Sequence, residues 1–137
     1  FGALCYDDYA HHPEEVRVTL RAFRELFPEK RLTVVFHPHT FTRTKALLPE
    51  FAQCFTDADR VHLLDIYGSA RETQGGVASQ DIVDLMDRFS AGKASVAHDI
   101  DILIDELEKT MGRNDVIISM GAGDVWKVSH TLAKREG

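Results

Sequence analysis

LTVVF, residues 32–36, is a nearly continuous apolar run in a chain of 137 residues. Such a run is typical of a strand that is buried on both faces of a sheet. A second run, VIISM at residues 116–120, has the same character and ends at Gly121. Strands covered on both faces need helices above and below them, so the two runs indicate an α/β protein.

Strands and helices are expected to alternate along the rest of the chain. Further strands are predicted at residues 3–6, 61–66 and 94–97. Apolar stripes at helical spacing lie within residues 16–27, 47–55, 82–89, 100–111 and 125–132, with Ser79 and Asp99 as expected N-caps. The alternation predicts a three-layer, Rossmann-like fold, with a mostly parallel sheet of about five or six strands and helices on both faces. The longest irregular segment, residues 68–77, is expected to be an exposed loop.

The composition is that of one globular domain, residues 1–137, with an apolar share of 44%. Its net charge of −6, from 16 basic and 22 acidic side chains, argues against nucleic-acid binding. No apolar run approaches the roughly 20 residues that span a membrane, so no membrane contact is expected. Two cysteines, Cys5 and Cys54, fit a reducing cytoplasm. The chain starts at Phe1 without a Met and soon enters a strand, so we expect it to belong to a larger protein.

The segment DDYAHHP, residues 7–13, joins the first expected strand to a helical pattern. Pro13 suits the first position of a helix, because its missing N–H would be unpaired there. The carboxyl end of a strand, where ligands bind in open α/β sheets, therefore receives two carboxylates, an aromatic ring and two imidazoles: Asp7, Asp8, Tyr9, His11 and His12. The alternative is that Asp8 and the histidines only cap the turn, although capping needs one such residue rather than four.

The segment HPHTFTRTK, residues 37–45, directly follows the LTVVF strand. Residues 31–49 contain no carboxylate, yet they include Arg31, His37, His39, Arg43 and Lys45. This composition at a strand end suits an anion, and Arg43 can hold a carboxylate or phosphate in a bidentate fork. A solvated basic patch is the alternative interpretation.

The third segment, GAGD at residues 121–124, lies between the VIISM strand and the last helix. Glycines at this position let backbone N–H groups approach an anion at a helix start. The signal is weak, because a dinucleotide fingerprint needs a third glycine. Asp124 can be only an N-cap, and its charge opposes direct phosphate binding, so both interpretations stay open.

In a parallel sheet the three segments share one edge and can line one cleft. An Asp for ribose hydroxyls, histidines near phosphate oxygens and an Arg for a carboxylate together indicate a site for a nucleotide and an acid. The chain contains no phosphate-gripping P-loop sequence. Its histidines lack the spacing of a closed zinc site, so no metal ligands are predicted.

Four motifs, YDDYAHHP, VVFHPHTFTRT, DIYGSARE and MGAGDVWKV, occur in that order over residues 6–128. Together they resemble the C-terminal domain of the Mur ligases, the ATP-dependent ligases of peptidoglycan synthesis. The His-Pro-His-Thr-Phe-Thr-Arg-Thr segment favours the alanine-adding members over the tripeptide-recycling ones. Many relatives have Gln where this chain has His37 and Arg where it has Thr40, which places more of the anion binding on Arg43.

The resemblance implies the third domain of an enzyme whose sugar-binding and P-loop ATPase domains are absent from this chain. It implies UDP-N-acetylmuramate, L-alanine and ATP as ligands of the full enzyme, with Mg²⁺ held by the missing domains and the phosphates. By position, Asp8 and Tyr9 face the adenosine, and His11 and His12 lie near the nucleotide and the reacting centre as catalytic residues. His39 and Arg43 meet the carboxylate of alanine, and Gly121 and Gly123 complete the pocket through backbone contacts. The isolated domain is expected to fold but to be inactive.

Other classes stay open at this point, including another Mur-type ligase. A free-standing Rossmann-like nucleotide-binding module fits the alternation and the Gly-x-Gly, but it explains the carboxylate-free segment less well. A dinucleotide oxidoreductase fits poorly, because no complete Gly-x-Gly-x-x-Gly follows the first strand.

Overall fold

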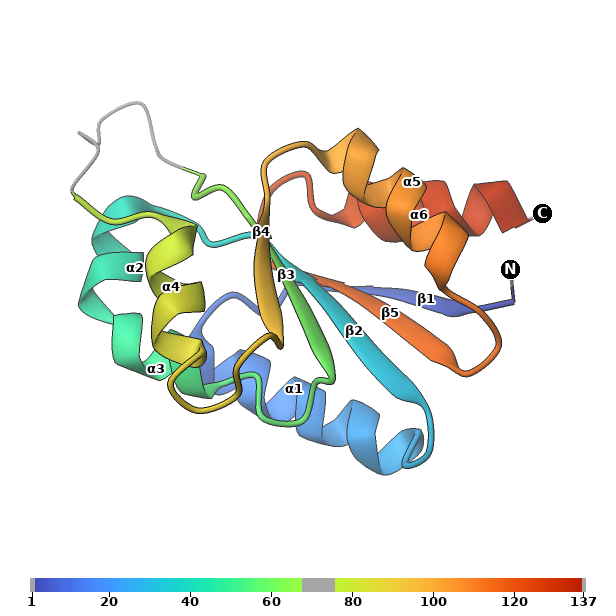
Figure 1. The fold of residues 1–137 in the computed structure, drawn as a ribbon, viewed down its shortest axis with the longest axis horizontal. Helices are drawn as coiled ribbons and strands as arrows, with labels where there is room; N and C mark the ends of the chain where they lie inside the picture. Colours follow the sequence, from blue (N-terminus) through green and yellow to red (C-terminus); the bar gives the residue numbers. More distant parts are fainter. Residues whose placement is uncertain (1, 68–75, 137) are drawn as a thin grey trace.

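The computed structural model describes residues 2–67 and 76–136, so residues 68–75 of the predicted exposed loop lie outside the described residues (Figure 1). The elements alternate in the order β1 (Leu4–Asp8), α1 (Pro13–Leu26), β2 (Arg31–Phe36), α2 (Phe41–Ala46), α3 (Leu48–Gln53), β3 (Arg60–Leu64), α4 (Ser79–Met86), β4 (Ala94–Ala97), α5 (Ile100–Thr110), β5 (Asp115–Met120) and α6 (Trp126–Glu136). Five strands form one sheet in the order β1-β5-β2-β3-β4, and all neighbouring pairs are parallel. The predicted α/β class and parallel sheet are confirmed.

Helices cover both faces of the sheet, as predicted (Figure 1). One core lies between the sheet and α1, α3 and α4, and it contains Leu20, Phe51 and Ile82. The other core lies beneath α5 and α6 and contains Leu103 and Leu132. Elements of this chain alone therefore enclose both cores.

The two apolar runs occupy the centre of the sheet. In β2, Val34 and Phe36 point into the first core, whereas Val35 points into the second. In β5, Ile118 joins the first core and Ile117 the second. Because successive strand residues point to opposite faces, a strand covered on both sides must be apolar throughout.

The first strand is longer at its carboxyl end than predicted. β1 pairs with β5 as far as Asp8, which lies opposite Met120, so both aspartates belong to the strand. Asp7 and Asp8 consequently point to opposite faces of the sheet. The predicted strand, residues 3–6, ended before both aspartates, a residue type that is depleted in strands.

Two local predictions around the helices need correction. The stripe at residues 47–55 contains one helix, α3, which starts at Leu48 with Pro49 in its first turn, but the separate helix α2, which ends at Ala46, was not predicted. Proline is tolerated there but would disrupt a helix interior, which explains the break between α2 and α3. Ser79 is not the N-cap of α4 but its first residue, and its hydroxyl donates to the carbonyl of Leu64 at 2.6 Å. Asp99 caps α5 as predicted, accepting from the backbone N–H groups of residues 101 and 102.

Cys5 and Cys54 pack against opposite cores, and no disulfide joins them. Within the described ranges, no helix is both long and apolar enough to cross a bilayer.

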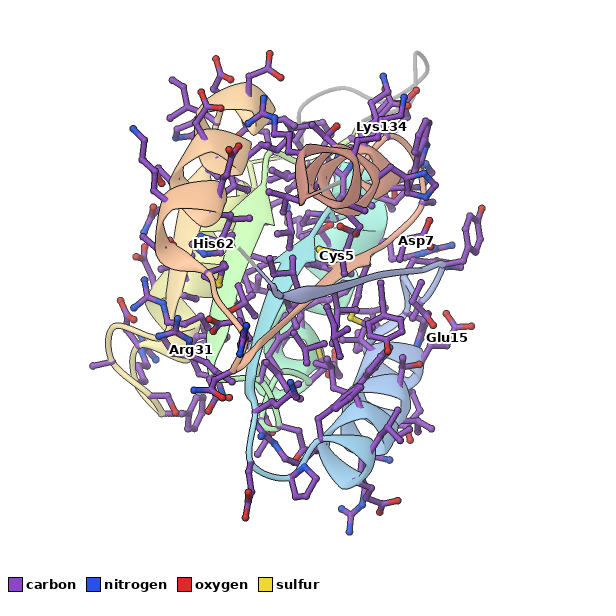
Figure 2. The ribbon with its side chains drawn as sticks, turned by 90° about the vertical axis from the view of Figure 1, so that its right-hand side faces the viewer. Cys5, Asp7, Glu15, Arg31, His62 and Lys134 are labelled. Atoms are coloured by element: carbon purple, nitrogen blue, oxygen red, sulfur yellow. The ribbon has the colours of Figure 1, made fainter. Side chains whose placement is uncertain are left out.

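His62, labelled in Figure 2, makes the stability of the fold dependent on pH. Burial, with a smaller contribution from Arg60, lowers its pKa from 6.5 to about 4. As the pH falls below 6.5 the unfolded chain takes up this proton first, so stability declines until the pH approaches 4. We expect the free energy of unfolding to be about 1–2 kcal/mol lower at pH 5 than at pH 7 through this residue.

Denaturant unfolding of the chain and of its His62→Gln variant at the two pH values measures this contribution. The variant cannot titrate at this position, so its stability should change less over the same interval. An equal loss in both proteins would show that His62 is not responsible.

Candidate functional site

The turn after β1 is held by its own polar side chains. His12 is the N-cap of α1, and its Nδ1 accepts from the backbone N–H of Glu14 at 3.2 Å. Asp8 Oδ1 accepts from the backbone N–H of Ala10 at 2.8 Å. Pro13 occupies the first helical position, as predicted. Asp8 and His12 therefore have local structural roles, whatever else they bind.

Asp7, which the sequence analysis named in the turn but gave no role, faces the side of the sheet covered by α6. Its Oδ2 lies 3.0 Å from Nε2 of His130, a residue of α6. Figure 2 shows Asp7 at the end of β1, well away from Arg31 at the start of β2. The sequence does not distinguish the two aspartates. Their opposite orientations follow from the pairing of β1 with β5, which continues as far as Asp8.

A cavity of about 500 Å³ opens between the end of β1 and the start of α6. Four of the predicted site residues share it, with four that were not predicted: Asp8, Tyr9, Gly121 and Gly123, together with Asp7, Ser119, Val125 and Trp126. The structure thus brings the first and third predicted segments together at the carboxyl edge of the sheet. His11, His12, His39 and Arg43 are not among the residues that line this cavity.

The glycine loop after β5 packs directly against the end of β2. Gly121 has a φ of 123°, and a Cβ on it would lie 2.8 Å from the carbonyl oxygen of His37. Gly123 has a φ of 94°, and a Cβ there would lie 3.4 Å from His37 Nδ1. Both glycines are therefore required by backbone conformation and close packing, independently of any ligand.

His37, which directly follows β2, contacts both the glycine loop after β5 and the segment after β3. Only 9% of the residue is exposed, and its backbone N–H donates to Met120 at 3.1 Å. Its ring meets Tyr67, which follows β3, edge-on at 5.6 Å. Burial lowers the pKa of His37, and the nearby His39 lowers it further, which favours the neutral imidazole. Its Nδ1 is buried and has no hydrogen-bond partner in the described part of the chain.

His39 contacts the segment after β3, and Arg43 belongs to α2; neither residue lines the cavity. The His39 ring stacks on Tyr67 at 5.4 Å, and the backbone of Thr40 donates to Tyr67 at 2.7 Å. Thr40 has a φ of 65°, a conformation that costs a β-branched residue free energy and that is typical of functional loops. Its hydroxyl caps α2 by accepting from the backbone N–H of Arg43.

The Arg43 side chain is half-buried in α2, and no carboxylate of the described residues pairs with it. Arg31 pairs with Asp115 at 2.6 Å, whereas Arg60, Arg88 and Arg113, like Arg43, have no carboxylate partner among the described residues. The carboxylate-free composition of residues 31–49 is thus accompanied by an available guanidinium, which suits an anionic ligand.

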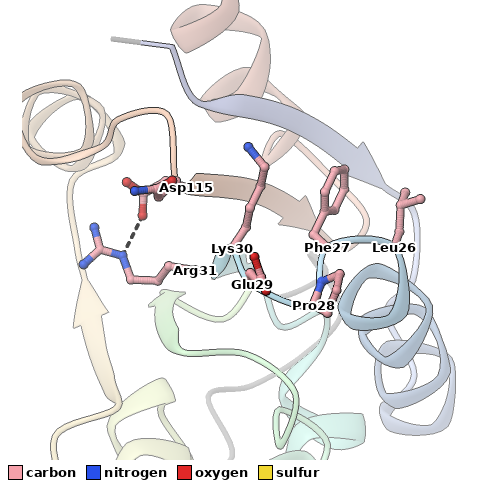
Figure 3. Close-up of a pocket in the computed structure, with 8 residues that line it drawn as sticks. Leu26, Phe27, Pro28, Glu29, Lys30, Arg31 and Asp115 are labelled. Carbon is pink, nitrogen blue, oxygen red and sulfur yellow. Dashed lines mark hydrogen bonds and ion pairs between the residues drawn. The ribbon is translucent and has the colours of Figure 1, made fainter.

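A larger cavity of about 720 Å³ lies at the opposite, amino edge of the sheet (Figure 3). The buried carboxylate in its lining, Asp115, already has partners. Asp115 accepts from Arg31 and from the backbone of Gly112, and Lys30 Nζ donates to the carbonyl of Arg113 at 2.8 Å. Because ligands of open α/β sheets bind at the carboxyl edge, we assign no binding role to this cavity.

No group of three His, Cys, Asp or Glu side chains that could hold a metal ion occurs among the residues that the structure describes.

A parallel sheet with a cavity at the carboxyl ends of its strands is the arrangement typical of α/β domains that bind ligands at this edge. The profile of the family described as "Mur ligase, glutamate ligase domain" matches residues 2–123. The chain belongs to this family, as the sequence motifs predicted.

Similar proteins agree with this assignment. The UDP-N-acetylmuramate–L-alanine ligase of Desulfitobacterium hafniense is 42% identical over 132 residues, which cover 96% of this chain and 29% of that protein. The ligase of the same name from Lactobacillus helveticus is 42% identical and covers 98% of this chain. The crystal structure of UDP-N-acetylmuramate-alanine ligase from Thermotoga maritima matches with a TM-score of 0.70 and 27% identity, over 96% of this chain and 26% of that one. The chain therefore spans less than a third of the length of these relatives.

Proposed function

We propose that this chain, residues 1–137, is the C-terminal domain of an ATP-dependent ligase that joins L-alanine to UDP-N-acetylmuramate in peptidoglycan synthesis. Three relatives described above carry that name or its equivalent, and the chain corresponds to about a quarter of their length. In the proposed enzyme, which acts in the cytoplasm, the sugar-binding and P-loop domains belong to the same polypeptide.

The proposed chemistry proceeds through an acyl phosphate. ATP phosphorylates the muramyl carboxylate, the amino group of L-alanine attacks the activated carbonyl, and phosphate leaves. Mg²⁺, when bound by the other domains and the phosphates, neutralises charge that develops in the phosphoryl step. The residues of this chain bind and orient the reactants.

The adenosine is proposed to lie in the cavity beside β1, with Asp8 and Tyr9 in contact with it. Asp7 also lines this cavity, with its Oδ2 3.0 Å from His130 Nε2. His11 and His12 are proposed to lie near the nucleotide and the reacting centre, where the other domains close over the turn. Gly121 and Gly123 are proposed to contribute backbone contacts from the cavity floor.

The alanine carboxylate is proposed to bind His39 and Arg43. The observation that carries this assignment is the half-buried guanidinium of Arg43, which pairs with no carboxylate of residues 2–67 and 76–136 and lies one helical turn beyond the strained Thr40. Backbone strain is concentrated where a loop must present its groups in a fixed geometry. The stacked Tyr67 ring limits the motion of His39 next to it.

Arg43→Ala in the full-length polypeptide tests this assignment. Loss of a charge-assisted hydrogen bond of about 1.5–3 kcal/mol should raise the KM for L-alanine by about 10- to 100-fold. The KM for ATP should change far less. Lys45→Ala, an exposed cation on the same helix, is the matched control and should leave both constants nearly unchanged. Equal increases in the two KM values for Arg43→Ala would remove Arg43 from the alanine site.

A further inference from the structure

Two exposed aromatic side chains line the cavity beside β1. Tyr9 follows the strand and is 72% exposed, and Trp126 opens α6 and is 44% exposed. Trp126 is the chain's single tryptophan. Large aromatic surfaces left open at a cavity mouth are typical of binding sites, where their burial supplies affinity.

The Trp126 ring is held in place by its neighbours in α6. The ring of His130 meets it edge-on at 5.0 Å, and Lys127 Nζ lies 6.0 Å from its centroid. His130 is also fixed by its contact with Asp7, at 3.0 Å. A platform with restricted motion loses little conformational entropy when a flat ligand stacks on it.

The charged residues of the cavity suit the base and ribose of a nucleotide better than its phosphates. Asp7 and Asp8 line it, and no lysine or arginine does so within the described residues. Asp124 follows Gly123 directly, but its Oδ2 pairs with Lys127 Nζ at 3.5 Å and it does not line the cavity. A lining with two carboxylates and without a lysine or arginine suits the hydroxyl donors of a ribose and a neutral base better than it suits phosphate groups. The glycine loop therefore does not serve here as a phosphate cradle.

We infer that Trp126 is the stacking platform for the adenine base, and that the phosphates leave the cavity toward the other domains. This inference rests on the proposed function and deepens it, because it assigns the base to a residue of this chain. A cavity of about 500 Å³ falls within the range that encloses small ligands. His130 acts as a positioning residue, since it holds Asp7 and supports the edge of the Trp126 ring.

Calorimetry on the full-length polypeptide tests the inference with ADP, adenosine and pyrophosphate as separate ligands. Trp126→Ala should weaken ADP and adenosine by about ten-fold, as loss of a base–aromatic stack does, and leave pyrophosphate unchanged. Trp126→Phe keeps an aromatic face and should stay within about three-fold of the parent protein. Phe89→Ala, which removes an exposed aromatic ring that does not line this cavity, is the matched control.

The outcomes separate this inference from the proposed function. An ADP affinity that Trp126→Ala leaves unchanged, or a parallel loss of pyrophosphate binding, would overturn the stacking assignment even in an active ligase. Trp126→Ala could weaken ADP and adenosine binding as expected while the parent polypeptide releases no ADP in response to L-alanine. That result would contradict the proposed function but not the stacking assignment. A parent polypeptide that binds no ADP would contradict both.

Discussion

The 137-residue chain, purified and assayed alone, is expected to release no ADP from ATP in the presence of UDP-N-acetylmuramate and L-alanine. It contains no P-loop sequence, and the cavity beside β1 is lined by carboxylates rather than by cations. Phosphoryl transfer depends almost entirely on positioning and on electrostatic stabilisation of the phosphates. A domain that supplies neither should show activity at the level of the buffer control.

The same preparation must be folded for this result to be informative. A cooperative thermal transition, expected because both cores are enclosed by elements of this chain, provides that control. The full-length polypeptide assayed in parallel should turn over all three substrates. Substrate-dependent ADP release by the isolated chain, proportional to its concentration, would refute the claim that the other domains supply the groups that bind the phosphates.

Gly121→Ala is expected to be the most damaging small substitution at the carboxyl edge. The new Cβ would lie 2.8 Å from the carbonyl oxygen of His37, at a φ of 123° that alanine rarely adopts. Neither partner can move freely, because Gly121 donates to Asp8 and His37 donates to Met120 through their backbones. We expect a loss of about 3 kcal/mol or more in the free energy of unfolding, together with a displaced glycine loop.

Gly92→Ala is the matched control for this experiment. Gly92 also has a positive φ, 79°, but a Cβ on it would meet no atom within 4 Å. Its substitution should therefore cost only the conformational term, about 1 kcal/mol. Denaturant unfolding of the two variants separates backbone conformation from close packing. Similar losses in both would show that the contact between Gly121 and His37 is not a constraint.

Much of the fold could be predicted, because its central strands leave few alternatives. The runs LTVVF and VIISM are apolar on both faces, which requires helices on each side of β2 and β5. The end of β1 could not be predicted in the same way. Asp7 and Asp8 have poor strand propensity, and they are strand residues only because β5 supplies a pairing partner as far as Met120.

The candidate site was predicted in its segments but not in its geometry. Tyr9 and Gly121 share a cavity because β1 and β5 are neighbours in the sheet. Neither sequence motif predicts which strands are neighbours. Trp126 was not predicted as a site residue, because a single aromatic residue at the start of a helix forms no periodic pattern in the sequence. His37 looked like one cation of a basic segment, yet burial lowers its pKa and the glycine loop covers it.

The central claim is that this chain serves an alanine-adding ligase, and the most direct test is the amino-acid specificity of the full-length polypeptide. ADP release is measured with UDP-N-acetylmuramate and, in separate reactions, L-alanine or the tripeptide L-alanyl-γ-D-glutamyl-meso-diaminopimelate. We expect release with L-alanine and none above background with the tripeptide. Release with the tripeptide but not with L-alanine would contradict it and place the chain with the tripeptide-recycling ligases.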